Sequence, residues 1–570
     1  MKSHYLFLTL LLLLAFALPG CDKDHIVLVD PATSDNDDQD LSDNDFDLTV
    51  KVTFSTSGDA TVSGANEDFS VAVDGNGVTI AYRGDSTVLY SLSGTTSDGF
   101  LKLYNGSLQG IALNSVSITN KSGAAINIQG PQSSPKDGGP TYIIVNGNSA
   151  LADGPSYANT PSDEDEKAAL FSEGQLVFSG NGSLTVTATG KSGITSDEYV
   201  HFMSAPTVTV TSTAGHGIRG TDYILLSGGS LDISVSANTR KGMSSDGYVQ
   251  IDGGSATVAV TGSAAYDSED GGYSGTAGIK ADGFFRMNGG ALTITNSGTG
   301  GKGISCDGAG YFNGGTVTVT TTGANYTAGD ISAKGMKFDG NLLFAGSDVT
   351  VNCSAHEGIE SKGAITITDG KIYSYSAKDD AINSAGDFTI SGGYVCGYAT
   401  SNDGLDANGN FYINGGLVYA IGSSSPEVAI DANTEGGYKL YVQGGTIIAI
   451  GGLENNSSLT QSCYSASSWS ANTWYALTVG SDTYAFKTPQ SGGTPLVVSG
   501  SSTPTLKSGV SASGGTTIFE GMLTAGANVS GGTSVSLSSY NGGGGGGHGG
   551  GGGGGGSGHG GGGGPGGGGW

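Results

Sequence analysis

One phrase recurs through the chain, and its period restricts what the chain can fold into. Each copy opens with a small residue followed by an aliphatic one, as in Gly358-Ile359 and Gly404-Leu405. Most copies follow one another at 23 to 25 residues, and two spacings are longer, at 36 and 32 residues. A fixed period in this range is typical of solenoid proteins. The anchor pairs are Gly193-Ile194, Gly217-Ile218, Gly242-Met243, Gly278-Ile279, Gly303-Ile304, Gly335-Met336, Gly358-Ile359, Ala381-Ile382, Gly404-Leu405 and Ala429-Ile430.

Within each repeat the hydrophobic period is 2, as in the run from Phe388 to Ile390, and Gly-Gly, Asn-Gly or Asp-Gly separates the runs. Such alternation and punctuation predict short strands joined by tight turns. No 3.6-residue pattern is long enough for a helix in each repeat, which excludes leucine-rich and ankyrin-like solenoids. The sequence therefore predicts an all-β parallel β-helix, whose coils lie about 4.8 Å apart and whose equivalent side chains form ladders.

The first residues have the pattern of a secretory signal, with a basic Lys2, a short apolar core and small residues at its end. The apolar core is too short for a comfortable membrane span. Leu18-Pro19-Gly20-Cys21 resembles the bacterial lipobox, which implies cleavage before Cys21 and acylation of its thiol. We therefore expect a lipid-anchored protein of the bacterial cell envelope, at the outer membrane or the cell surface.

Local composition separates segments that can bury a hydrophobic core from segments that cannot. Residues 22–47 contain ten aspartates and few large apolar groups, and the terminal segment contains 24 of the 104 glycines, so neither can bury a core. A solenoid also needs capped ends, because its terminal coils expose core and unpaired backbone. The predicted segments are a lipoprotein signal (1–20), an acidic flexible tether (21–47), an N-terminal cap with irregular coils (48–190), regular coils (191–452), a small C-terminal β cap (453–540) and a disordered Gly-rich tail (541–570).

The net charge of −28 makes nucleic acid and anionic lipid surfaces poor partners. Besides Cys21, the four cysteines sit at different points of their repeats, so no stacked pair and no disulfide scaffold is expected.

Acidic residues form two patterns along the repeats. In the middle repeats an aspartate follows the anchor aliphatic by three residues, and Lys241, Lys302 and Lys334 stand just before their anchors. These two columns are expected to form a salt-bridged edge that also serves turns. The aspartates are Asp197, Asp246, Asp282, Asp307 and Asp339.

In the late repeats acids flank the anchor on both sides and lysine is mostly absent, apart from Lys362 and Lys378. Neighbouring coils would bring several carboxylates within a few ångströms, where they repel strongly unless a cation neutralises them. A hard cation with oxygen ligands fits, and calcium fits best. A structural turn remains the alternative. The predicted ligands are Glu357, Glu360, Asp379, Asp380, Asp403, Asp406 and Asp431.

The strand after each Gly-Gly turn changes character along the chain. Its outward positions are threonines in the early coils, such as Thr293 and Thr295, and tyrosines in the late coils. Tyrosine offers a flat apolar face to sugar C–H groups and keeps a hydroxyl for hydrogen bonding. The same ladder could instead stabilise the sheet by cross-strand stacking. The predicted ligand-binding residues are Tyr373, Tyr375, Tyr394, Tyr398 and Tyr419.

Several units carry a resemblance: KGMSSDGYVQIDGG, GIKADGFFRMNGG, KGISCDGAGYFNGG, GIESKGAITITDG, NDGLDANGNFYINGG and AIDANTEGGYKLYVQGGTIIAIGG. They resemble the bacterial carbohydrate-binding β-helix family, which is similar to family 9 polysaccharide lyases. The resemblance covers about residues 50–540. It implies a right-handed parallel β-helix, bound calcium and binding of cellulose and polygalacturonate, with weak or absent lyase activity.

The sequence thus predicts a non-catalytic, calcium-dependent, polysaccharide-binding surface lipoprotein, with cellulose or pectin-like polymers as partners. One alternative is a calcium-dependent pectate-type lyase, whose base would be Lys362 or Lys378. So many neighbouring carboxylates would raise a lysine pKa, which disfavours that role at neutral pH. Another alternative is a structural adhesin that only spaces a binding tip.

Overall fold

The computed structural model describes residues 38–542, apart from 158–159, 204–205 and 269–270. The signal, Cys21, most of the predicted tether and all but the first two residues of the predicted Gly-rich tail lie outside the described residues. The described part is all-β, as predicted, with only two 3-10 helices, η1 (Thr327–Gly329) and η2 (Thr434–Gly436). Neither of these helices is long and apolar enough to cross a membrane.

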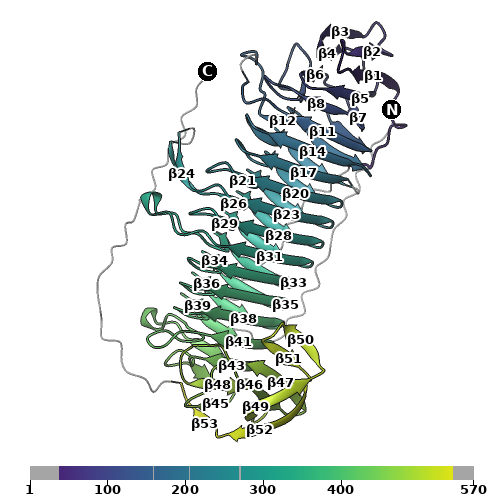
Figure 1. Cartoon of the computed structure of the whole chain (residues 1–570). Helices are drawn as coiled ribbons and strands as arrows, with labels where there is room; N and C mark the ends of the chain where they lie inside the picture. Colours follow the sequence, from purple (N-terminus) through teal and green to yellow (C-terminus); the bar gives the residue numbers. More distant parts are fainter. Residues whose placement is uncertain (1–37, 158–159, 204–205, 269–270, 543–570) are drawn as a thin grey trace, which may run out of the picture. The chain divides into compact units, whose positions relative to one another are not determined.

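The strands stack in three parallel ladders, and each strand pairs with the equivalent strand of the next repeat (Figure 1). The first, here called the anchor ladder, is a 14-stranded sheet. Its strands are β3 (Phe69–Asp74), β4 (Asn76–Tyr82), β6 (Gly99–Tyr104), β9 (Ile126–Gln129), β12 (Ala168–Ser172), β15 (Ser192–Ser196), β18 (Ile218–Gly220), β21 (Lys241–Ser245), β26 (Ala277–Ala281), β29 (Lys302–Cys306), β32 (Met336–Phe338), β34 (Ile359–Ser361), β36 (Ile382–Ser384) and β39 (Leu405–Ala407).

The other two ladders belong to one 31-stranded sheet. The middle ladder contains β1 (Leu48–Phe54), β5 (Val88–Thr96), β7 (Gln109–Asn114), β10 (Thr141–Asn146), β13 (Leu176–Gly180), β16 (Tyr199–Phe202), β19 (Tyr223–Leu226), β22 (Tyr248–Ile251), β27 (Phe284–Met287), β30 (Ala309–Phe312), β33 (Leu342–Cys353), β35 (Ile365–Ser376), β37 (Phe388–Ile390), β40 (Phe411–Ile413), β42 (Leu440–Val442) and β44 (Ser458–Leu459). Two early strands are exceptions to the parallel pairing: β2 (Thr61–Ser63) pairs antiparallel with β1, and β3 of the anchor ladder pairs antiparallel with β4.

The third ladder contains β8 (Ser117–Thr119), β11 (Asn148–Ala152), β14 (Ser183–Ala188), β17 (Thr207–Ser212), β20 (Ser230–Val235), β23 (Ser255–Val260), β28 (Ala291–Asn296), β31 (Thr316–Thr321), the second halves of β33 and β35, β38 (Tyr394–Ala399), β41 (Leu417–Ile421) and β43 (Thr446–Ile450). Burial alternates along these strands, as in β28, so period 2 separates an inner from an outer face.

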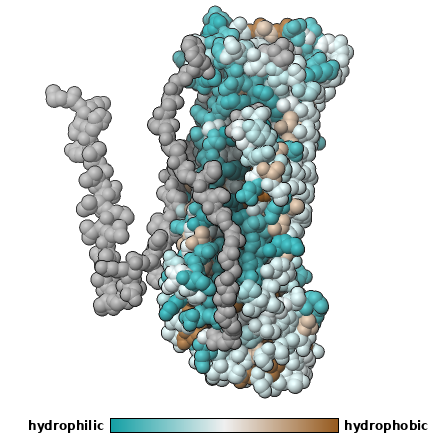
Figure 2. Space-filling view, turned by 90° about the vertical axis from the view of Figure 1, so that its left-hand side faces the viewer, coloured by the Kyte–Doolittle hydropathy of each residue, from teal (hydrophilic) through white to brown (hydrophobic). Residues whose placement is uncertain are grey.

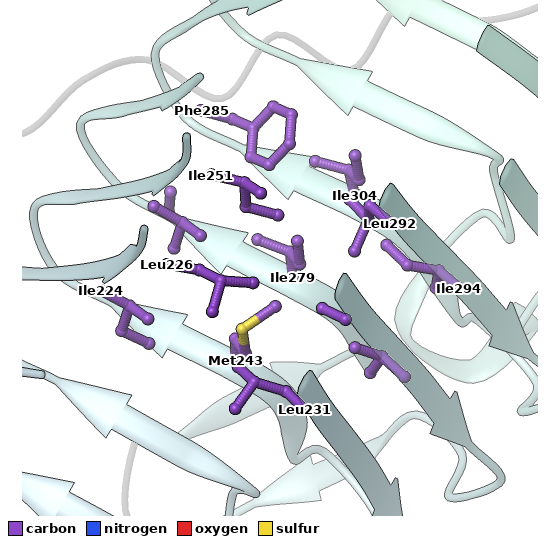
Figure 3. Close-up of a cluster of buried hydrophobic side chains, with 14 of the residues drawn as sticks. Ile224, Leu226, Leu231, Met243, Ile251, Ile279, Phe285, Leu292, Ile294 and Ile304 are labelled. Carbon is purple, nitrogen blue, oxygen red and sulfur yellow. The ribbon is translucent and has the colours of Figure 1, made fainter. Parts of the chain in front are cut away.

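The predicted anchors lie in register. Ile304 pairs with Met336, Met336 with Ile359, and Ile359 with Ile382. Their side chains are buried and pack against those of the other two ladders (Figure 3). Figure 3 labels part of this core: Ile224, Leu226, Leu231, Met243, Ile251, Ile279, Phe285, Leu292, Ile294 and Ile304.

Close packing explains why most anchor pairs start with glycine. A Cβ on Gly242 would lie 2.2 Å from Cγ1 of Val258 in the third ladder and 2.6 Å from the carbonyl oxygen of Gly278 in the next repeat. Real Cβ atoms do not approach so closely, so a larger residue would force the coil apart.

Parallel pairing ends after β43 and β44, and antiparallel strands follow. The strands β45 (Cys463–Ala466), β48 (Leu496–Ser499) and β53 (Ser538–Tyr540) extend the large sheet. A separate six-stranded sheet, here called the C-terminal sheet, contains β46 (Trp474–Val479), β47 (Asp482–Lys487), β49 (Thr505–Ser513), β50 (Thr516–Phe519), β51 (Leu523–Ala525) and β52 (Asn528–Val535). The two long repeats carry insertions, one of which forms the hairpin β24 (Ala265–Asp267) and β25 (Gly272–Ser274).

The described end of the predicted tether is not a free, solvated chain, which corrects the prediction for residues 38–47. The carboxylate of Asp38 accepts a hydrogen bond from the Tyr199 hydroxyl at 2.9 Å and contacts His201 Nδ1 at 2.8 Å. Phe46 packs on Leu89, Ala112 and Ile144. A phenyl ring and a paired carboxylate thus hold this segment against the middle ladder.

The four cysteines in the described residues, Cys306, Cys353, Cys396 and Cys463, are free and buried. The prediction that they form no disulfide is confirmed.

Candidate functional site

Six of the seven predicted acidic ligands occupy two columns beside the anchors, and the seventh, Asp379, directly precedes Asp380. The column one residue after the anchor aliphatic runs from Glu360 to Asn383 and Asp406. Single bridges from Leu405 to Ile430 and from Ile430 to Leu453 extend it to Asp431 and Glu454. The column two residues before the anchor aliphatic contains Glu357, Asp380 and Asp403. The structure divides these acids into two groups with different neighbours.

Three of the predicted ligands lie in an ion-pair network. Lys334 Nζ lies 3.0 Å from Oε2 of Glu357 and also contacts Glu360, which Lys362 contacts from the other side. His356 Nδ1 contacts Glu357 and lies 2.9 Å from Oδ2 of Asp379. Burial opposes the charge on His356, but hydrogen bonds to Asp379 and Glu357 raise its pKa to about 9. The protein's own cations therefore pair with Glu357, Glu360 and Asp379. His356, Glu357 and Asp379 also place ligand atoms within 4.8 Å of one another, so the prediction that Glu357 and Asp379 bind a metal ion stays a prediction.

The other four predicted ligands lie together without a basic partner. We call Asp380, Asp403, Asp406 and Asp431, together with Glu454, the acidic cluster. Asp403, Asp406 and Asp431 each place a carboxylate oxygen within 4.8 Å of the others. Glu454 is a hydrogen-bond neighbour of Asp431. No ion pair to a basic side chain joins these acids within the described residues.

Burial and mutual repulsion act on the acidic cluster. Burial and the neighbouring Asp406 raise the pKa of Asp380 to about 8. Burial, opposed by a hydrogen bond from the backbone of Val428, raises the pKa of Asp403 to about 9. Burial and the hydrogen bond to Glu454 also raise the pKa of Asp431. At neutral pH the cluster either takes up protons or binds a cation.

Hydrogen bonds hold the carboxylates in place. Asp380 Oδ1 accepts from the backbone N–H of Asp403 at 3.1 Å, and its Oδ2 accepts from Asn383 Nδ2 at 2.9 Å. The Asn383 amide also donates to Asp406 Oδ2 at 2.9 Å. Asp403 Oδ1 accepts from the backbone N–H of Val428 at 2.6 Å. A preorganised, oxygen-only donor set suits calcium, whereas zinc prefers nitrogen and sulfur.

The sequence prediction missed Asn383 and Glu454. Asn383 lies between Glu360 and Asp406 in the column that follows the anchors. Its position between two acids becomes visible only when the strands of neighbouring repeats are aligned. Glu454 had a signal, because Gly452-Leu453 repeats the anchor pair 23 residues after Ala429-Ile430. The period therefore extends one repeat further than the prediction allowed.

The aspartates of the middle repeats form ion pairs, as predicted, but with other partners. Asp246 pairs with Arg219 at 2.7 Å, and Asp307 pairs with Lys280 at 2.7 Å. Lys337 pairs with Asp339 at 2.6 Å. The basic residues that follow the anchor aliphatic by one position share a side with the aspartates two residues later, because side chains alternate along a strand. The predicted partners Lys241, Lys302 and Lys334 lie in the other column.

A further group of three acids, Asp165, Glu173 and Asp197, lies near the start of this aspartate column. Lys167 Nζ lies 3.1 Å from Asp165 and 2.5 Å from Asp197. This group also has a cation of its own, unlike the acidic cluster.

The predicted tyrosine face is largely covered. Tyr373, Tyr375 and Tyr398 are half-buried and alternate with buried residues, as expected. Tyr419, however, is fully buried: its hydroxyl donates to the backbone oxygen of Lys487 at 2.7 Å, and its ring meets Phe486 edge-on. The prediction that Tyr419 binds a ligand is wrong.

The C-terminal sheet provides the cover. Tyr373 lies 6.1 Å from Phe519, measured between ring centroids, and Tyr373, Tyr394 and Tyr398 all pack against the hydrophobic cluster of that sheet. Tyr375 packs edge-on against Tyr398, with centroids 5.2 Å apart. Period 2 predicted which face the tyrosines occupy, but it carries no information on what covers that face.

Comparison with known proteins gives one family and one fold neighbour. A family model described as "Carbohydrate-binding domain-containing protein" matches residues 74–404, which is more than half of the chain. No curated protein matches. Among solved structures, the polysaccharide lyase-like protein from C. thermocellum, in a gadolinium derivative, is 20% identical with a TM-score of 0.34. That match covers 52% of this chain and 96% of the other.

Proposed function

Because the chain belongs to the family of carbohydrate-binding domain-containing proteins, we propose that it binds polysaccharides in a calcium-dependent manner and does not cleave them. The acidic cluster is the calcium site of this proposal. Asp380, Asp403, Asp406 and Asp431 would hold the ion, with Asn383 positioning two of them. The bound ion would supply positive charge and coordination positions for sugar hydroxyls or a uronate carboxylate.

One observation carries this proposal. Three carboxylates lie within 4.8 Å of one another and are largely buried, yet no basic side chain compensates them within the described residues. Elsewhere in the same chain, comparable acids are paired with lysine, arginine or histidine. Acids without a basic partner can stay charged in a buried cluster at neutral pH when a bound cation neutralises them.

We infer a right-handed parallel β-helix as the fold behind this site. The three parallel ladders, each advancing by one repeat per strand, support that inference. In such a fold equivalent residues stack at about 4.8 Å, which is how acids from different repeats come to share one ion.

Binding without cleavage is favoured over lyase chemistry. A lyase base must lose its proton near neutral pH and stand beside the calcium-bound uronate. Lys362 instead forms an ion pair with Glu360, so its amine already has a carboxylate partner. Lys302 has a pKa lowered to about 8, first by burial and then by Lys337 and Lys334. It stands three repeats before Asp380 in the same column, about 14 Å away at the spacing of stacked strands.

We also propose that Cys21 is acylated and anchors the protein to the cell envelope, with cellulose or pectin-like chains as ligands. Replacing Cys21 with alanine would then release the protein from the membrane fraction of the producing cell. Retention of the Cys21→Ala variant in that fraction would refute the anchor without affecting the calcium site.

The calcium proposal is tested by unfolding and by binding on the full chain. Calcium should raise the unfolding temperature and increase retention of polygalacturonate, and a chelator should reverse both effects. The double change Asp403→Asn with Asp406→Asn should abolish both responses. The matched control is Asp282→Asn with Asp307→Asn, which removes two aspartates of the same ladder that Lys280 already neutralises. An unchanged melting curve of the wild-type protein with and without chelator would reject the proposal.

A further inference from the structure

The two long repeats bring three tyrosines together outside the acidic cluster. One insertion supplies Tyr266 and Tyr273 on the β24–β25 hairpin, which projects from the stacked strands (Figure 1). The other supplies Tyr326, next to η1. The ring of Tyr273 lies 5.5 Å from that of Tyr266 and 5.9 Å from that of Tyr326, measured between centroids. The insertions are in contact, since a Cβ on Gly329 would lie 2.6 Å from Cβ of Tyr273.

Two of these tyrosines, Tyr266 and Tyr273, are unusually exposed, and Tyr326 is half-buried. Tyr266 keeps 58% and Tyr273 keeps 49% of its surface accessible, and Tyr438 is the one other exposed aromatic residue in the described part of the chain. The surrounding face is mostly hydrophilic (Figure 2). An exposed aromatic group on such a face is a feature of binding sites.

Ring orientation distinguishes this group from the aromatic ladder of the middle strands. Tyr199, Tyr223 and Tyr248 stack with centroids 4.4 and 4.8 Å apart and ring planes 8° from parallel. Each ring there covers the face of its neighbour, so only ring edges remain. In the second group the planes meet at 83° and 52°, so these rings do not stack face to face on one another. A sugar ring stacks on an aromatic face and not on its edge.

An unpaired cation lies at the base of the hairpin. A Cβ on Gly275 would lie 3.8 Å from Nζ of Lys302, and Gly275 is two residues after Tyr273. Lys302 forms no ion pair or side-chain hydrogen bond with any described residue. Next to it, Lys241 Nζ donates to Ser274 Oγ of the hairpin at 3.1 Å. In a chain with a net charge of −28, a half-buried ammonium that forms no ion pair is available to an anionic ligand.

We propose that Tyr266, Tyr273, Tyr326 and Lys302 form a second glycan site, which binds an anionic polysaccharide segment without calcium. Sugar rings would stack on the tyrosines, and a carboxylate or sulfate on the sugar would pair with Lys302. This site rests on the proposed polysaccharide binding but uses different residues and different physics from the acidic cluster.

The test measures glycan binding by affinity electrophoresis and calorimetry on the full chain in chelator. The probes are polygalacturonate, its neutral methyl ester, dextran sulfate and cellohexaose. We expect the wild-type protein to bind polygalacturonate or dextran sulfate more tightly than the two neutral probes. The preference between the two anionic probes identifies the anionic group.

Two variants and two controls assign the residues. Tyr266→Ala with Tyr273→Ala should weaken binding of all bound probes by roughly tenfold, whereas Tyr438→Ala should leave it unchanged. Lys302→Met should reduce the affinity for the anionic probe to that for the neutral probe, roughly tenfold, and Lys302→Arg should retain it. If the double tyrosine variant fails to fold, Tyr266→Ala alone serves, because its side chain is the most exposed.

Several outcomes overturn the second site. The first is no binding of either anionic probe in chelator. The second is an equal loss in Tyr438→Ala. The third is loss of chelator-resistant binding in the Asp403→Asn, Asp406→Asn variant, which would leave only the calcium site. A tyrosine-dependent dimer in sedimentation velocity would identify a second copy of the chain as the occupant instead. Failure of calcium-dependent binding with chelator-resistant binding intact would refute the proposed calcium site alone.

Discussion

The middle and late repeats both carry acids next to the anchor ladder, yet they place and neutralise them differently: the acids follow the anchor aliphatic by three residues in the middle repeats, and lie one residue after it or two residues before it in the late repeats. In the middle repeats the position after the anchor aliphatic holds Arg219, Lys280 or Lys337, and each pairs with an aspartate two or more residues away. In the late repeats that position holds Asn383, Asp406 or Asp431, and the charge stays uncompensated. The late repeats thus carry an acid or an amide where the middle repeats carry a basic residue, and this replacement distinguishes the candidate ion site from the salt-bridged edge.

The comparison suggests how to convert one region into the other. Asp406→Lys places in the late region the basic residue that Lys280 and Lys337 provide in the middle region. We expect this variant to melt higher than the wild-type protein in chelator and to gain nothing from calcium. The calcium-linked stabilisation that it loses would be about 4 kcal/mol at a calcium concentration a thousand times Kd. Differential scanning calorimetry with and without calcium measures both values.

Asp406→Asn is the control for that conversion, because it removes the charge without adding a cation. It should lose the calcium response without the gain in chelator. If Asp406→Lys still gains as much from calcium as the wild-type protein, the comparison between the two regions is wrong.

A pH series tests a buried base of the middle region. Burial and the neighbouring Lys241 lower the pKa of His216 to about 3, and its Nδ1 accepts the backbone N–H of Lys241 at 3.0 Å. The folded pKa lies below the ordinary value of 6.5, so the unfolded state binds more protons between pH 6.5 and 3. The free energy of unfolding therefore decreases as the pH is lowered through this window, by about 2 kcal/mol from pH 7 to pH 5 for this group alone.

His216→Gln should flatten that slope, whatever its effect on stability at pH 7. Urea unfolding at pH 7, 6 and 5 gives the slope for both proteins. Parallel slopes would show that His216 takes up its proton before unfolding.

Removing a contact between the late tyrosines and the C-terminal sheet should have a smaller effect on stability. Tyr419→Phe removes the hydroxyl that donates to the backbone oxygen of Lys487 and leaves that acceptor buried. We expect a loss of about 1–2 kcal/mol in the free energy of unfolding and no change in glycan affinity, since the side chain is fully buried. Weaker glycan binding by a fully folded Tyr419→Phe variant would show that Tyr419 contributes to glycan binding after all.

The smallest effect is expected in the exposed ion pairs of the middle region. Lys280→Met leaves Asp282 and Asp307 without their cation, but both carboxylates are about half exposed. Water screens them, so the expected cost is about 0.5–1 kcal/mol, with no calcium response. Lys280→Arg should restore the stability. A calcium response in Lys280→Met would show that loss of a lysine suffices to create an ion site, without the burial found in the late repeats.

The sequence by itself determined the repeat, the strand chemistry and the stacking of equivalent residues. The small residue of each anchor pair could be recognised from its recurrence, and the close approach of Val258 to Gly242 gives the physical reason for it. The same local logic placed Asp403, Asp406 and Asp431 within reach of one another. A period of 2 within a period of about 23 residues fixes both the face of a residue and its neighbours along the ladder.

Only the tertiary structure decided which acids have no basic partner and which strand faces are exposed to solvent. Glu357, Glu360 and Asp379 are paired because Lys334 and His356 reach them from neighbouring repeats. Tyr419 is buried because a sheet more than fifty residues further along the chain packs on it. Tyr273 and Tyr326 meet because two insertions from different repeats fold toward each other. Contacts of this kind depend on side-chain reach and on non-repeating segments, and neither obeys the period that made the rest of the chain predictable.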